Sequence, residues 1–259
     1  MTVNKNDLND LKLAKQLIEN PGLAARITNL LGRPIEKGLE ALPKEWNEKL
    51  ATIAQKSLLK AANTAIFTMK DQSYTKSSTL SHKLAVATSG GIGGFFGLAG
   101  LAIELPLSTI IMLRSIIEIS REQGESINNI DTKLACLEVF ALGGASTYDD
   151  GTETGYYAIK TLLAKSISES TRYIAEKKII EDSAPGLLKL ITKIAERFSI
   201  QISEKIAGQA VPIIGAAGGA LINTIFMDHF QDIAKGHFTI RRLERQYTTA
   251  TIKKLYSEI

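Results

Sequence analysis

The chain has 259 residues, of which 44% are hydrophobic, 6% aromatic and 22% charged, and its formal net charge is +4 at pH 7. This length and apolar content suffice for one large or two small globular domains. The small positive charge is compatible with contact with anionic lipid, but it excludes an argument for nucleic-acid binding on charge alone. The single cysteine, Cys136, excludes an internal disulfide framework and is typical of a reducing compartment.

The N-terminal part of the chain predicts helices that end at prolines and glycines. Asn6 can cap a helix that runs to about Glu19, and a second helix over residues 23–31 ends at Gly32. Pro43 can open a long helix from residue 44 to about residue 69, in which apolar residues recur with a helical period. We interpret residues 1–35 as an N-terminal helical arm and residues 36–259 as one helical domain.

Two charge-free runs, residues 84–103 and 206–227, contain glycines at helical spacing. Glycine costs a helix interior about 1 kcal/mol relative to alanine, so such spacing favours close helix packing. The predicted packing glycines are Gly90, Gly93, Gly94, Gly97, Gly100, Gly215 and Gly219. Both runs are long enough to span a bilayer, but small and polar residues replace the leucines that drive insertion. We therefore favour a buried central helix pair over transmembrane helices.

Helical patterns also dominate the rest of the chain. Pro106 predicts a kink or a new helix that runs to about Arg121, and a short apolar helix follows over residues 131–142. Further helices are expected over residues 156–180 and 184–206, then in the second glycine-rich segment up to Gly236, and finally over residues 239–255. No convincing strand alternation is present. The predicted fold class is all-α, a compact multi-helix bundle with a central pair of glycine-rich apolar helices.

Three ionisable residues, Glu104, Arg114 and Glu138, occupy positions that the periodicity assigns to the core. A buried charge without a partner costs several kcal/mol, so we expect these side chains to pair with one another or with other polar groups. One interpretation is a structural ion-pair network. The alternative is a polar pocket in which buried carboxylates act as acid, base or ligand, with Asn223, Asp228 and His229 as further candidates.

Known catalytic and cofactor-binding motifs are not found in the sequence. Asp228, His229, Asp232 and His237 are close together, but no His-Glu-x-x-His motif is present, so no metal site is predicted. The glycine-rich run lacks the Gly-Lys-Ser/Thr of a phosphate-binding loop, and no Gly-x-Ser-x-Gly elbow occurs. We therefore predict no cofactor.

The C-terminal segment HFTIRRLERQY has an amphipathic basic pattern. Arg241, Arg242 and Arg245 lie beside the apolar face of the expected helix, where they are candidates for contact with a membrane surface. The alternative is that these arginines form a solvated face or pair with nearby carboxylates and helix ends.

The segments GGIGGFFGLAGLAIELPLSTIIMLRSI, LACLEVFALGG and PIIGAAGGALINTIFMDHFQDIAKGHFTIRRLER resemble the EcsC protein family, with similarity from about Pro34 to Tyr247. That family comprises bacterial proteins named for a member encoded beside an ABC transporter, and it has no assigned biochemical role. The resemblance implies a cytoplasmic or membrane-associated helical protein. It implies no catalytic residues.

Two functional hypotheses follow. The first is a non-enzymatic, membrane- or lipid-associated protein, accessory to a transporter or another membrane process, with anionic lipid or a membrane protein as partner and a cytoplasmic, peripheral location. The second is a hydrolase-like enzyme acting on an apolar substrate through Glu104, Arg114, Glu138, Asp228 and His229. A weaker third idea is insertion of the glycine-rich helices into bilayers.

Overall fold

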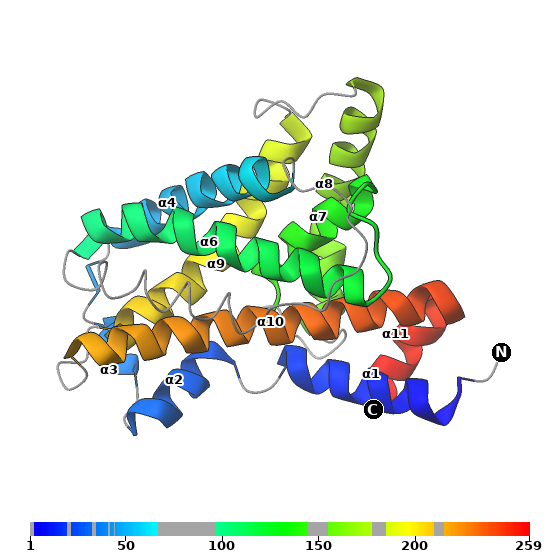
Figure 1. Ribbon diagram of the computed structural model, residues 1–259, viewed down its shortest axis with the longest axis horizontal. Helices are drawn as coiled ribbons and strands as arrows, with labels where there is room; N and C mark the ends of the chain where they lie inside the picture. Colours follow the sequence, from blue (N-terminus) through cyan, green and yellow to red (C-terminus); the bar gives the residue numbers. More distant parts are fainter. Residues whose placement is uncertain are drawn as a thin grey trace.

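The computed structural model describes residues 3–19, 22–32, 35–40, 42–43, 45–66, 97–143, 155–177, 185–209 and 215–259. All regular secondary structure within these ranges is helical, which confirms the predicted all-α class (Figure 1). The α-helices are α1 (Lys5–Glu19), α2 (Leu23–Leu31), α3 (Glu36–Glu40), α4 (Trp46–Ala61), α6 (Gly97–Glu122), α7 (Ile130–Glu138), α8 (Gly155–Lys177), α9 (Pro185–Gln209), α10 (Gly215–Tyr247) and α11 (Thr249–Glu258). A π-helical turn, η1 (Ala62–Ile66), follows α4, and a 3-10 turn, η2 (Val139–Ala141), follows α7.

The long helix α10 organises the bundle. Its 33 residues correspond to about 50 Å at the α-helical rise. In Figure 1, α1 lies along one side of α10 and α6 along the other, while α9 crosses the bundle. The two helices that contain the C-terminal parts of the glycine-rich runs, α6 and α10, are therefore direct neighbours in the bundle.

Aromatic side chains from α9, α10 and η2 fill the centre of the core. The Phe140 ring lies 5.0 Å from Phe198 and 5.2 Å from Phe230, and Phe226 lies 5.1 Å from Phe230, measured between ring centroids. All four side chains are fully buried. Tilted and edge-on ring pairs at such distances add to the stabilisation from burial, which holds η2, and with it the end of α7, against the long helices.

Two predicted helix boundaries are wrong. The helix α6 continues through Pro106, so the predicted alternative of a new helix starting at this residue is wrong. Proline removes the N–H that would bond the carbonyl of Ala102, and Ala102 is exposed, so water can take the place of that donor. The helix α10 continues through Gly236 to Tyr247. An added Cβ at Gly236 would lie 2.7 Å from the Ala14 carbonyl oxygen, so this glycine permits close approach of α1 and does not end the helix.

The α1 helix begins two residues earlier than predicted. Asn4, not Asn6, accepts a hydrogen bond from the Asp7 backbone N–H at 2.8 Å and caps the helix. Leu11 and Ala14 of α1 are buried against the bundle. The proposed division at residue 35 stays a prediction.

The predicted packing glycines are only partly within the described residues. Gly90, Gly93 and Gly94 lie outside them. Gly97 begins α6, in which Gly100 is buried, and Gly215 begins α10, in which Gly219 is half-buried. Their packing role stays a prediction.

One described helix segment, Gly100–Glu122 of α6, is long and apolar enough to cross a membrane by length and composition alone. A buried core helix passes the same test, and 56% of the relevant window is buried in this fold. This feature is therefore weak support for a membrane span.

Candidate functional site

Glu138 is the last residue of α7, a helix that packs against α6 and α8, and its side chain is buried near His237 of α10. The side chain of Asn129 caps α7 by accepting from the Asp131 backbone N–H. Glu138 is only 3% exposed, and its Oε1 has no hydrogen-bond partner among the described residues. Its Oε2 lies 3.7 Å from Nε2 of His237, which is too long for a strong hydrogen bond. The carboxyl group thus has unused hydrogen-bonding capacity.

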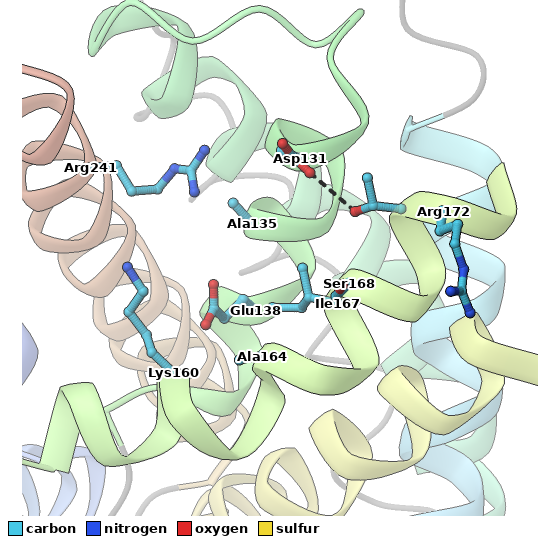
Figure 2. Close-up of a pocket in the computed structure, with 10 residues that line it drawn as sticks. Asp131, Ala135, Glu138, Lys160, Ala164, Ile167, Ser168, Arg172 and Arg241 are labelled. Atoms are coloured by element: carbon cyan, nitrogen blue, oxygen red, sulfur yellow. Dashed lines mark hydrogen bonds between the residues drawn. The ribbon is translucent and has the colours of Figure 1, made fainter. Parts of the chain in front are cut away.

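A pocket of about 610 Å³ opens beside this carboxyl group, between α7, α8 and α10 (Figure 2). Its lining comprises Asp131, Ala135, Glu138, Lys160, Ala164, Ile167, Ser168, Thr171, Arg172 and Arg241. On α8 the lining residues recur at intervals of three and four, so one face of that helix forms a wall of the pocket.

Two cations approach the Glu138 end of the pocket from different helices. Figure 2 shows Lys160 of α8 and Arg241 of α10 on the same side of the pocket as the Glu138 carboxyl group, while Arg172 lies at the opposite end. Lys160 Nζ lies 3.1 Å from Glu244 Oε2, and Arg241 Nε donates to Glu125 Oε1 at 2.9 Å. These ion pairs fix the positions of both cations and leave them partly accessible, with about one fifth of each side chain exposed.

Behind Glu138, a buried histidine and a buried tyrosine complete the site. The Tyr156 hydroxyl lies 3.0 Å from Nδ1 of His237, and both residues are buried. Burial and the charges of Lys160 and Arg241 hold the pKa of His237 well below its ordinary value, so the imidazole is neutral. Tyr156 can satisfy Nδ1 in either tautomer, which leaves Nε2 facing Glu138.

The environment of Glu138 favours its neutral form. Burial raises the pKa of the Glu138 carboxyl above its ordinary value, and the nearby Lys160 and Arg241 offset this only in part. Glu244 adds to the increase in this pKa. A protonated carboxyl group can donate a hydrogen bond as well as accept one. The pocket therefore combines two fixed cations with a carboxyl group that can donate a hydrogen bond once it is protonated, a set that suits an oxyanion.

The other predicted carboxylate, Glu104, lies in a separate buried cluster. Glu104 Oε1 accepts a hydrogen bond from Lys205 Nζ of α9 at 2.7 Å, and Asn223 Nδ2 of α10 lies 3.4 Å from the same oxygen. Asn223 thus meets Glu104 as expected, but Glu138 does not belong to this cluster. Arg114 is exposed on α6, so its assignment to the core is wrong. The apolar residues around α6 conceal which of its faces is buried.

The remaining candidates on α10, Asp228 and His229, do not line the pocket. His229 is buried, and burial lowers its pKa to about 3, so it is neutral. Among the described residues, no group of three or more His, Cys, Asp or Glu side chains has an arrangement that could hold a metal ion.

The three candidate surface arginines all pair with other groups in the chain. Arg241 and Arg245 both contact Glu125, and Arg242 Nη2 lies 2.6 Å from Asp10 Oδ2. These contacts agree with the alternative interpretation of this segment, in which the arginines pair with nearby carboxylates. A role at a membrane surface stays a prediction.

Sequence reasoning missed the α8 side of the pocket and considered His237 only as a metal ligand. Lys160 follows Tyr156 by one helical turn and precedes Ala164 by another. The sequence did offer one signal for this side of the pocket, a lysine between an aromatic residue and a small residue on one helix face. It does not reveal that α7 and α10 face the same space, because that proximity arises only from tertiary packing.

Comparison with known proteins gives a single match. The model of the EcsC protein family matches residues 11–243 of the chain, from α1 to near the end of α10. Neither the search of curated proteins nor the search of solved structures found a match.

Proposed function

This chain belongs to the EcsC protein family, and we propose that it binds a lipid-like molecule whose anionic headgroup enters the pocket between α7, α8 and α10. The observation that carries the proposal is the buried Glu138 carboxyl group, with an unpartnered oxygen, beside two cations fixed on neighbouring helices. Charge-assisted hydrogen bonds from lysine and arginine are the usual contacts for phosphate and carboxylate groups.

The apolar part of the lining favours an amphiphile over a free inorganic anion. Ala135, Ala164 and Ile167 line the same pocket as the charged groups. Ligand sites typically combine apolar walls with a few polar groups that fix orientation. A short acyl chain can cover these side chains while its headgroup meets Lys160 and Arg241. An accessory role in a membrane process, as the family resemblance implies, is part of this proposal.

Calorimetric titration of the full chain with dihexanoyl phosphatidic acid, below its micelle concentration, tests this proposal. The Lys160→Gln and Arg241→Gln variants each remove one cation, and we expect at least a tenfold loss of affinity, about 1.4 kcal/mol, from each. Lys165→Gln is the matched control, because Lys165 is exposed on α8 and does not line the pocket. Thermal unfolding of every variant checks that the fold is retained.

Two further ligands separate the possible sources of the anion. Dihexanoyl phosphatidylcholine has the same chains with a zwitterionic headgroup, and we expect weaker binding. Inorganic phosphate has the charge without the chains. Equal affinity for inorganic phosphate and phosphatidic acid would contradict a lipid-like ligand, and no binding of any anion would contradict the pocket as an anion site.

A second candidate function, contact with a membrane surface, is favoured by one face of α6. Ile103 and Leu107 are 80% and 52% exposed, and Arg114 lies two turns further along the same face. An apolar face with an adjacent cation suits an anionic bilayer surface. Flotation with anionic liposomes should be reduced by the double variant Ile103→Ser/Leu107→Ser and not by Leu162→Ser on α8, where the side chain is 40% exposed. Equal flotation of wild type, the double variant and Leu162→Ser would argue against membrane contact through this face of α6.

The hydrolase hypothesis has less support from the geometry. Of its five candidate residues, only Glu138 lines the pocket. The hydroxyl groups there belong to Ser168 and Thr171, and Thr171 donates to Asp131 at 3.1 Å in an exposed position. An activated nucleophile needs a base within hydrogen-bonding reach and exclusion of water. We therefore favour a binding function over catalysis.

A further inference from the structure

The buried carboxyl group at the end of the pocket suggests how its ligand is recognised. We propose that protonated Glu138 donates a hydrogen bond to the bound oxyanion, so that ligand binding takes up a proton from solvent. This inference rests on the proposed function. It adds that the anionic headgroup binds together with a proton on Glu138.

The geometry of the pocket supports this hydrogen bond. Glu138 Oε1 has no hydrogen-bond partner among the described residues, and the carboxyl group lies on the pocket wall at 3% exposure. A buried polar atom without a partner costs about 1–3 kcal/mol, and a ligand that supplies the missing partner removes that cost. In the pocket, the Glu138 carboxyl group and the two cations lie on the same side, so a single headgroup can meet all three (Figure 2).

The electrostatics of the pocket also favour a protonated Glu138 in the complex. An ionised Glu138 would repel an oxyanion at short range, whereas a protonated Glu138 would form a short, charge-assisted O–H···O⁻ hydrogen bond. The groups that face Glu138 do not supply the proton. His237 is neutral, Tyr156 is engaged with His237, and Arg241 keeps its charge because its pKa is raised by Glu125 against the effect of burial. Lys160 is paired with Glu244, and Asp131 and Arg172 lie further along the pocket.

The proposed hydrogen bond makes ligand affinity depend on pH. The bound oxyanion favours the protonated carboxyl group, so binding raises the pKa of Glu138 beyond the increase that burial already causes. Affinity is then highest at low pH and falls as the pH rises through the pKa of Glu138 in the free protein. For one linked proton the limiting slope is about tenfold per pH unit.

Calorimetric titration with hexyl sulfate at pH 5.5, 6.5, 7.5 and 8.5 tests this inference. The sulfate headgroup does not titrate in this range, so any proton uptake belongs to the protein. Each titration is repeated in two buffers of different ionisation enthalpy, which gives the number of protons bound. We expect wild-type protein to take up a proton at the higher pH values and to lose affinity there.

The Glu138→Gln variant is the matched control, because the amide donates a hydrogen bond at every pH. We expect it to bind hexyl sulfate with a nearly constant affinity, without the linked proton. If wild type binds and shows the same pH dependence and proton uptake as Glu138→Gln, the inference is wrong while the anion site stands. Binding of dihexanoyl phosphatidic acid without binding of hexyl sulfate at any pH would also overturn it.

A measurement on wild-type protein covers the case in which Glu138→Gln fails to fold. The ¹³C signal of the Glu138 carboxyl group distinguishes its protonated and ionised forms, and in the presence of saturating hexyl sulfate its titration should move to higher pH. An unchanged or lowered titration midpoint would refute the hydrogen bond. Failure of every anion to bind would instead refute the proposed function, so the two failures are distinguishable.

Discussion

Two buried carboxylates, Glu104 and Glu138, come from neighbouring stretches of sequence and have opposite surroundings. Glu104 is 2.7 Å from the ammonium group of Lys205, which is fully buried. Glu138 has no cation at hydrogen-bonding distance among the described residues and lines a pocket of about 610 Å³. A charge in a predicted core position is therefore ambiguous until its partner is known. A close partner indicates a structural ion pair, and an unused oxygen on a pocket indicates a ligand site.

The largest expected effect is on the Glu104 side of this comparison. Lys205→Met keeps the approximate volume of the side chain but leaves Glu104 buried without its cation, so we expect a loss of about 3–5 kcal/mol in the free energy of unfolding. Urea denaturation measures the loss. The double variant Glu104→Leu/Lys205→Met should recover part of it, because no buried charge is then left unpaired. A loss below about 1 kcal/mol in the single variant would show that the pair is not structural.

A third buried carboxylate, Glu204 of α9, has a hydrogen-bond partner, as Glu104 does, and a raised pKa, as Glu138 does. It accepts a hydrogen bond from the Ala24 backbone N–H at the start of α2, yet burial raises its pKa to about 7. The folded state binds the Glu204 proton more tightly than the unfolded state does. Glu204 therefore contributes most to the free energy of unfolding below about pH 4.3, which is its pKa in the unfolded chain. Its contribution is lost as the pH rises from there through about 7.

Thermal unfolding at a series of pH values measures this contribution. Between pH 4.5 and 7, the Tm of wild type should fall by several degrees relative to Glu204→Gln, at about 2–4 °C per kcal/mol for a chain of this size. Glu196→Gln is the control, because Glu196 is exposed on the same helix. Parallel profiles for wild type and Glu204→Gln would refute the raised pKa.

The smallest expected effect on stability is at Glu138. Because the carboxyl group has no strong hydrogen bond to lose, Glu138→Gln should change the free energy of unfolding at pH 7 by less than about 1 kcal/mol, in either direction. Urea denaturation beside Lys205→Met gives the direct comparison. A loss as large as that of Lys205→Met would remove the distinction between the two sites.

Helical periodicity predicted the all-α fold and the burial of both glutamates, because each lies among apolar residues spaced three and four apart. The same rule failed for Arg114. On α6 the side that carries Ile103, Leu107 and Arg114 is apolar at most positions but faces outward. When a helix is apolar nearly all round, the pattern does not show which face is buried.

The partners of these residues were beyond sequence reasoning for another reason. Lys205 lies 101 positions after Glu104, and Lys160 and His237 reach Glu138 from different helices. Their proximity depends on how α8, α9 and α10 pack, which no local pattern encodes. Gly236 shows the same limit. Sequence reasoning placed a helix end at this glycine, whereas in the fold it permits close contact with α1.

We propose that Glu138 belongs to a ligand site, whereas Glu104 belongs to the structural core. The most direct test is an NMR titration of ¹³C-carboxyl-labelled protein with dihexanoyl phosphatidic acid, with signals assigned from Glu138→Gln and Glu104→Gln spectra. We predict that the Glu138 signal shifts in a saturable manner while the Glu104 signal stays in place. A shift at Glu104 without one at Glu138, or no shift at either residue, would contradict this account.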